Sequence, residues 1–181
     1  HEIQNFLNWF ARTDFKHKIF IAGNHDFGFE HGFEIDQEFK DMGVIYLQDS
    51  EVTIDGVKFY GSPWQPEFYD WAFNLPRGEK LAQKWSKIPG NTDILITHGP
   101  VYGLLDYAPH GGHVGCEELY RRVFDVKPKI HVCGHIHGAY GQKSIEGVEF
   151  LNASVLDERY EHAHKPIVVE FNTETKEVVY A

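Results

Sequence analysis

The segment KIFIAGNHD, residues 18–26, runs from an apolar stretch directly into a polar turn. A short apolar run that ends at a glycine is typical of a buried strand. The turn behind it places Asn24, His25 and Asp26 next to one another. A solvated turn needs a glycine and one or two polar residues, but it has no need of an amide, an imidazole and a carboxylate together. This concentration predicts a functional site at the end of the strand.

Helical and extended patterns alternate along the rest of the chain. Amphipathic spacing predicts helices over residues 1–10, 34–43, 78–88 and 115–128. Apolar runs predict strands within residues 44–48, 94–97, 129–141, 147–155 and 166–172, and a hairpin turn at Asp55-Gly56 within residues 50–63. This order favours a layered α/β fold with helices outside central sheets. Because no linker divides residues 1–181, we expect a single domain.

Composition and charge narrow the classes of function. The formal net charge of −10 argues against broad nucleic-acid binding, because there is no basic surplus to displace counterions from phosphates. No apolar run approaches the roughly 20 residues of a membrane span, so no membrane partner is expected. Two cysteines, Cys116 and Cys133, are too few for a disulfide scaffold and suit a reduced, cytoplasmic setting. Twelve histidines favour metal binding through neutral imidazole.

Polar side chains also follow two later strands. His98 comes directly after residues 94–97, and His135 and His137 come after the apolar part of residues 129–141. Because ligand sites in α/β sheets gather beyond the carboxyl ends of strands, we expect these side chains to meet Asn24. Nitrogen and oxygen donors without thiolate suit manganese, iron, zinc or nickel. Two such ions can hold an attacking hydroxide and the phosphoryl oxygens, which predicts hydrolysis of phosphate esters.

Three motifs carry a resemblance to a known family. GNHD at 23–26, THGP at 97–100 and GHIH at 134–137 resemble the third, fourth and fifth motifs of the calcineurin-like metallophosphoesterase superfamily. The segments HVGCEEL at 113–119 and LNAS at 151–154 are similar to those of its small, single-domain, phosphodiesterase-like members. The resemblance implies an α-β-β-α sandwich of two mixed sheets flanked by helices, with metal-dependent hydrolase activity.

The resemblance also implies roles for individual residues. Four resemble metal ligands, three of them for one ion and the last for a second: Asn24, His98, His135 and His137. His25 resembles the family histidine that donates to a phosphoryl oxygen or protonates the leaving group. Asp26 resembles the partner that orients this histidine.

The sequence departs from the family at its beginning. The family's first two motifs are an Asp-x-His strand and a Gly-Asp strand whose carboxylate bridges the two metals, and neither motif occurs here. We therefore expect the domain at 1–181 to be N-terminally incomplete, with the missing strands supplied upstream or by another chain, including a second copy. Two interpretations stay open. One is a phosphoesterase acting on small phosphodiesters or nucleotides, and the other is a catalytically impaired member that binds a nucleotide, a phosphate or a partner chain.

Five other residues have less direct expectations. Trp64, Trp71 and Trp85 are expected in the core rather than as a platform for a base. His110 and His113 fall in a loop, where a place beside the substrate and no role at all are both open.

Overall fold

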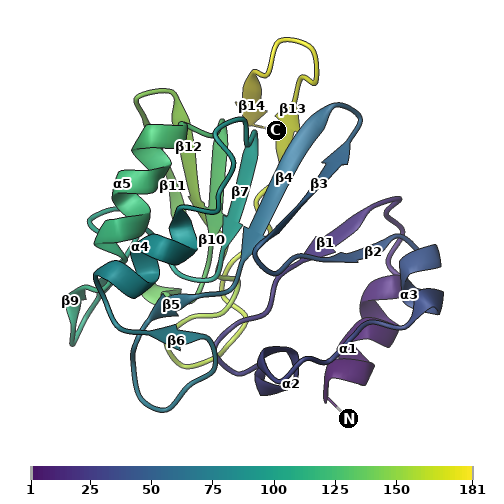
Figure 1. The fold of residues 1–181 in the computed structure, drawn as a ribbon, viewed down its shortest axis with the longest axis horizontal. Helices are drawn as coiled ribbons and strands as arrows, with labels where there is room; N and C mark the ends of the chain where they lie inside the picture. Colours follow the sequence, from purple (N-terminus) through teal and green to yellow (C-terminus); the bar gives the residue numbers. More distant parts are fainter. Residues whose placement is uncertain (1, 181) are drawn as a thin grey trace.

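The computed structural model describes residues 2–180, so residue 1 of the first predicted helix lies outside the described residues. A six-stranded mixed sheet forms its centre (Figure 1). In spatial order its strands are β11 (Gly141–Ile145), β12 (Val148–Asn152), β10 (Ile130–Cys133), β7 (Ile94–Thr97), β4 (Val57–Ser62) and β3 (Ser50–Ile54). The four inner strands are parallel, and each edge strand is antiparallel to its neighbour. The α/β prediction is confirmed.

The predicted hairpin turn joins β3 to β4. Ile54 pairs with Val57, which leaves a two-residue turn at Asp55 and Gly56. Both turn residues have positive φ, at 49° and 77°. A two-residue turn of this kind matches the right-handed twist of the two strands, which explains why Asp-Gly predicts it.

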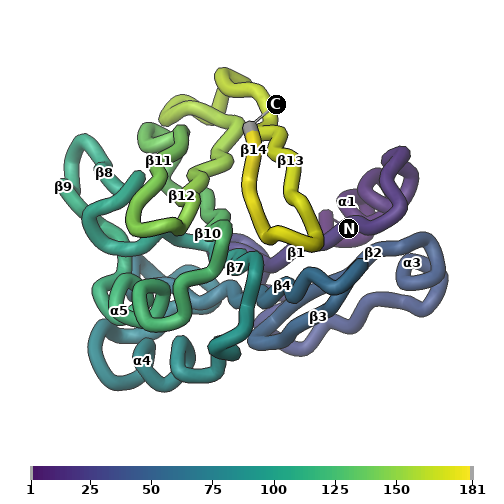
Figure 2. The backbone as a smooth tube through the Cα atoms, turned by 90° about the horizontal axis from the view of Figure 1, so that it is seen from above, coloured from purple at the N-terminus to yellow at the C-terminus, as the bar shows by residue number. Residues whose placement is uncertain are grey.

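Both faces of the central sheet are covered. Two helices lie over one face and a hairpin lies over the other, namely α4 (Glu79–Trp85), α5 (Glu117–Val126), β13 (Val169–Phe171) and β14 (Val178–Tyr180). Figure 2 shows the helices and the hairpin on opposite sides of the central strands. In β7, Leu95 packs in the core beneath the helices, whereas its neighbour Ile94 packs toward the hairpin. Burial on both faces explains the continuous apolar run of this strand.

A second, smaller layer carries the first motif. Its two strands, β1 (Lys18–Phe20) and β2 (Val44–Tyr46), are parallel. Three helices accompany them, which are α1 (Glu2–Ala11), α2 (Phe27–Glu30) and α3 (Gln37–Asp41). Leu7 of α1 and Phe39 of α3 are buried in the core of this layer. β1 ends at Phe20, and residues 21–23 continue outside any strand into the motif turn.

The sequence did not predict β11 or β14, and it did not predict four very short strands. They are β5 (Gln65–Pro66), β6 (Asn74–Leu75), β8 (Tyr107–Ala108) and β9 (Gly112–His113). A strand of two residues is too short to show the alternation by which strands are recognised. Each pair braces a loop, the first between residues 66 and 74 and the second between residues 108 and 112.

Among residues 2–180, no helix has the combination of length and apolar character that crossing a membrane requires.

Candidate metal centre

The predicted donors emerge from neighbouring strand ends. β7 and β10 are adjacent and parallel, so His98 and His135 follow them at the same edge of the central sheet. The backbone N–H of Gly134 donates to the carbonyl oxygen of His98 at 3.0 Å, which ties the two motifs together. Asn24 reaches this edge from the smaller layer, where it follows β1.

Asn24 and His98 are in direct contact. Oδ1 of Asn24 lies 2.7 Å from Nε2 of His98, and the backbone nitrogen of Asn24 lies 3.3 Å from the same ring nitrogen. The ring centroid of His135 is 4.5 Å from that of His98. One amide oxygen and two imidazoles from three motifs therefore meet at one point.

Backbone features of the motifs hold these rings in place. A Cβ on Gly23 would lie 2.7 Å from Cε1 and 2.9 Å from Nδ1 of His98, so only glycine lets the imidazole lie against the first motif. His135 has a φ of 68°, in the left-handed region that residues other than glycine seldom adopt. Backbone strain of this kind is concentrated at functional sites, where the surrounding structure holds a side chain in a required position.

His137 is oriented by a loop near the C-terminus. Its Nδ1 lies 2.8 Å from the carbonyl oxygen of Asp157. A carbonyl oxygen only accepts hydrogen bonds, so Nδ1 carries the proton, and the neutral tautomer with this arrangement has its lone pair on Nε2. A hydrogen bond of this kind to the second ring nitrogen is the usual arrangement for a histidine that binds a metal through the first.

Five of the six predicted site residues line one cavity of about 510 Å³. They are Asn24, His25, His98, His135 and His137. Three residues of the loop that follows Val155 complete one wall, which are Leu156, Glu158 and Tyr160. Trp71 forms part of another wall, with ring centroids 5.3 Å from His25 and 6.1 Å from His135. The structure therefore brings together residues that lie more than one hundred positions apart.

The imidazoles of His98 and His135 are half-buried, and this burial favours their neutral form. Burial lowers the pKa of His98 to about 3, with His135 adding to the effect. Burial likewise lowers the pKa of His135 to about 4, and His137 is the next cause. Because a metal ion competes with a proton for the imidazole lone pair, a histidine that is already neutral at pH 7 is ready to bind one.

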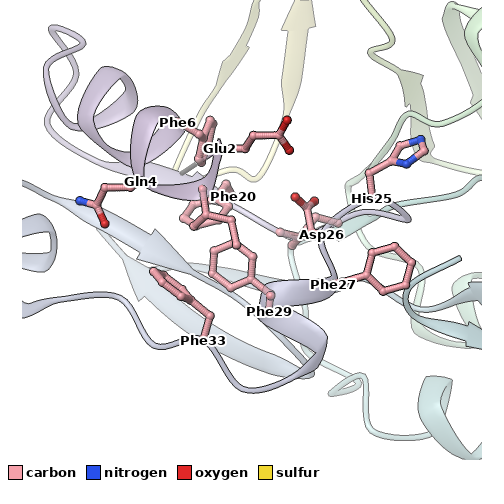
Figure 3. Close-up of a pocket in the computed structure, with 12 residues that line it drawn as sticks. Glu2, Gln4, Phe6, Phe20, His25, Asp26, Phe27, Phe29 and Phe33 are labelled. Atoms are coloured by element: carbon pink, nitrogen blue, oxygen red, sulfur yellow. The ribbon is translucent and has the colours of Figure 1, made fainter.

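Asp26 lies apart from this cavity. Its Oδ2 accepts the backbone N–H of Gly23 at 2.6 Å, and no hydrogen bond joins it to His25 among residues 2–180. Burial raises the pKa of the Asp26 carboxyl, and the Gly23 bond and the nearby His25 oppose that rise. Figure 3 shows the carboxylate over a separate groove that it shares with Glu2 of α1. Asp26 therefore shapes the turn that presents Asn24 and His25.

The donor set fits one divalent ion. Within residues 2–180, no three His, Cys, Asp or Glu residues lie close enough to hold an ion by themselves. An ion at this point would therefore take the Oδ1 of Asn24 together with His98 and His135. Neutral nitrogen and amide oxygen donors suit the first-row metals predicted from the sequence. Of the described side chains lining the cavity, Glu158 is the carboxylate, and it is exposed.

Some features of the site were missed or placed differently by the sequence. Trp71 is not a core residue, because it faces the cavity, whereas Trp85 is buried in the core as predicted. No feature of the sequence indicated that Glu158 and Tyr160 belong to the site, because they lie in a loop without a motif. His113 contacts Asp106 at 2.6 Å and is not among the residues that line the cavity.

Comparisons with known proteins agree with this arrangement. The family model for calcineurin-like phosphoesterase matches residues 1–139, which contain all three motifs. Metallophosphoesterase domain-containing protein 1 of Homo sapiens is 42% identical over 196 residues, covering 95% of this chain and 60% of that protein. A UPF0046 protein of Caenorhabditis elegans is 33% identical over 199 residues, covering 94% of this chain and 50% of that protein. The chain thus spans 50–60% of the length of these two relatives.

Solved structures share the fold at low sequence identity. The protein TT1561 of Thermus thermophilus superposes with a TM-score of 0.54 and 11% identity, covering 90% of this chain and 71% of that one. Another solved chain reaches a TM-score of 0.60 at 14% identity, covering 84% of this chain and 62% of that one. The match of the family model over most of the chain, with its motifs meeting in one cavity, shows that this chain belongs to the calcineurin-like phosphoesterase family.

Proposed function

We propose that this chain is a metal-dependent phosphoesterase that hydrolyses small phosphodiester or nucleotide-type substrates. One observation carries the proposal. Residues from three separate motifs, each suited to hold a metal ion or a phosphoryl oxygen, line a single cavity of about 510 Å³. A cavity of this size suits a small ester. Family membership supports a hydrolase acting on phosphoester bonds.

The chemistry divides between an ion and the residues of the chain. A divalent cation, which we propose to be Mn²⁺, Fe²⁺, Zn²⁺ or Ni²⁺, supplies charge for the phosphoryl oxygens and activates water. Asn24, His98 and His135 would hold it through one oxygen and two nitrogen atoms. His25 is exposed at the cavity wall, where its imidazole can give a proton to the departing oxygen. His137 offers Nε2 to a second ion or to the substrate.

Binding without turnover is the second candidate function. The small number of carboxylates in the cavity favours this function. Among the described residues that line the cavity, Glu158 is the one acidic side chain, and it is exposed. Such a protein would bind a nucleotide or phosphate through the imidazoles, or would combine with a second chain that supplies further donors. The two functions differ in whether product is released.

The test uses bis(p-nitrophenyl) phosphate and Mn²⁺ with His98→Gln, and with His17→Gln as the matched control. His17 is exposed in the connection before β1 and does not line the cavity. Replacing residues that only support metal ligands costs about 10–100-fold, so replacing His98 should cost at least about 100-fold in kcat/KM. His17→Gln should match the wild type. Equal turnover in His98→Gln and wild type would refute the assignment.

A further inference from the structure

A second cavity opens beside the imidazole cluster. It has a volume of about 530 Å³ and shares four lining residues with the first, which are Ala108, Pro109, His135 and Ile136. A cavity of this volume can hold the organic part of a small ligand. Because the two cavities meet at His135, a molecule with its phosphate at the imidazoles can extend into the second cavity.

Arg77 lines the second cavity, and the protein holds its guanidinium in one orientation. Nη1 donates to Oε2 of Glu117 at 2.5 Å and to the carbonyl oxygen of Gly115 at 2.7 Å, and Nη2 donates to the carbonyl oxygen of Val114 at 2.9 Å. The backbone N–H of Gly115 in turn donates to Oδ2 of Asp106 at 3.0 Å, and Asp106 is completely buried. The guanidinium is therefore anchored to a fixed part of the backbone.

Two N–H groups of Arg77 have no partner among the described residues. The hydrogen bonds above use both N–H groups of Nη1 and one of Nη2. The Nε–H and the second N–H of Nη2 remain, and the side chain is 43% exposed. These two donors lie on neighbouring nitrogens of one planar group, so they suit a ligand that offers two adjacent acceptors.

The charges around Arg77 favour a neutral ligand group. Glu117 already pairs with the guanidinium, and Glu67 lines the same cavity. These carboxylates would repel an anionic group, whereas a neutral acceptor would gain a hydrogen bond from a charged donor without that repulsion. The arrangement therefore favours a carbonyl oxygen and a ring nitrogen over a second phosphate.

An aromatic surface connects the two cavities. Phe68 and Tyr69 line the second cavity, Trp71 lines the first, and the three rings lie with their centroids 4.4–5.5 Å apart. Phe68 is 53% exposed and Tyr69 is 73% exposed. Nδ2 of Asn74 donates to the carbonyl oxygens of both Phe68 and Tyr69, at 3.2 Å and 2.7 Å, which fixes the backbone of their loop. Fixed and open aromatic faces are suited to stacking against a flat ring.

We infer that the second cavity is a purine site, which binds the O6 and N7 edge of a 6-oxopurine such as hypoxanthine or guanine. The ring lies against Phe68 or Tyr69, and the free N–H groups of Arg77 donate to O6 and N7. Arginine pairs with the same two atoms of guanine in DNA recognition. Adenine is disfavoured, because its exocyclic amino group would place a donor against a donor. The inference rests on the proposed function, since it takes the phosphate of the same molecule to lie at the imidazoles.

The test compares two esters that differ in one acceptor. The p-nitrophenyl esters of inosine 5′-phosphate and of 7-deazainosine 5′-phosphate release the same phenolate, but the second has a C–H group in place of N7. We expect the wild type to prefer the inosine ester about tenfold in kcat/KM, because one hydrogen bond from a charged donor is lost. Arg77→Lys keeps the positive charge beside Glu117 but lacks the planar pair of donors, so the preference should fall below about twofold. Arg121→Lys is the matched control and should leave the preference unchanged, because Arg121 is exposed on α5 and does not line the second cavity.

Further comparisons in the wild type and a binding measurement protect the test from a folding failure of the variant. The inosine ester should also be preferred about tenfold over the adenosine ester, in which an amino group replaces O6. Binding of the three nucleoside 5′-phosphates, measured by calorimetry, should show the same order without turnover. Phe68→Ala alters an exposed side chain and should lower kcat/KM for the inosine ester about tenfold relative to methyl p-nitrophenyl phosphate, which has no base to stack.

The outcomes separate the two proposals. Absence of turnover with methyl p-nitrophenyl phosphate, together with preferential binding of inosine 5′-phosphate, would refute the phosphoesterase and support the purine site. Turnover of all the esters by the wild type without a preference for inosine would refute the purine site and leave the phosphoesterase standing. A preference that survives in Arg77→Lys would also refute the purine site. Absence of both turnover and nucleotide binding would refute both proposals.

Discussion

Gly23→Ala should displace His98 without unfolding the chain. The new Cβ would lie 2.7 Å from Cε1 and 2.9 Å from Nδ1 of the imidazole, where carbon and nitrogen need about 3.4 Å or more. The ring must therefore move by roughly 0.5–0.7 Å. Its Nε2 lies 2.7 Å from Oδ1 of Asn24, so a movement of this size disturbs the donor pair. Overpacking of this kind costs about 1–3 kcal/mol of unfolding free energy.

The effect on activity should be larger than the effect on stability. A misplacement approaching 1 Å can cost about 100-fold in rate, and we expect a loss of about that size in kcat/KM with Mn²⁺ and bis(p-nitrophenyl) phosphate. Gly134→Ala is the matched control, because Gly134 also precedes a predicted ligand but its new Cβ would meet only Ser154 Oγ, at an ordinary 3.5 Å. Urea unfolding of both variants separates the two effects. Activity of Gly23→Ala above half that of Gly134→Ala would refute the steric reasoning.

Three further predictions concern the ion, the strained backbone and pH. Titration of the metal-free chain with Mn²⁺ should show at least one ion bound per chain through Asn24, and Asn24→Ala should abolish its binding; unchanged Mn²⁺ affinity in Asn24→Ala would contradict the donor set described above. The unfolding free energy of His135→Gly should exceed that of His135→Ala by about 1 kcal/mol, because the φ of 68° suits glycine. Equal urea midpoints for the two variants would count against backbone strain at this position. Burial lowers the pKa of His131 to about 3, so below pH 6.5 the unfolded chain gains a proton that the folded chain does not. Between pH 6.5 and 3, this group should therefore lower the unfolding free energy by up to about 1.4 kcal/mol for each unit that the pH falls. The measurement compares the unfolding free energy at pH 7.5 and pH 5 in the wild type and in His131→Gln. The same difference between the two pH values in both proteins would refute this prediction.

Several strands of the central sheet could be predicted because their signals are local. Residues 94–97 form β7 at the predicted bounds, since an apolar run buried on both faces needs no information from elsewhere in the chain. The Asp55-Gly56 turn was likewise predicted from its own dihedral requirements. Once the strands are parallel neighbours, the meeting of His98 and His135 follows from topology.

The walls of the site could not be predicted, because they depend on distant contacts. Trp71 has the same apolar character as Trp85, and only the path of the β5–β6 loop decides that one faces the cavity while the other is buried. The resemblance implied that Asp26 orients His25, whereas in the structure the Asp26 carboxylate accepts the backbone N–H of Gly23. Neither the orientation of Trp71 nor the hydrogen bond of Asp26 can be recognised from the spacing or the composition of the sequence.

The residues that could be predicted and those that could not lie on different kinds of element within the site. The candidate metal donors leave strand ends or a turn held by packing, so small changes such as the Cβ of an alanine at Gly23 are expected to disturb them strongly. The β5–β6 loop beside the site differs, because Phe68 and Tyr69 are exposed and hydrogen bonds from Asn74 hold only their backbone. Loop side chains of this kind can change without cost to the core. Substitutions at the loop should therefore alter which ester is bound, whereas substitutions at the strand ends should alter whether any ester is hydrolysed.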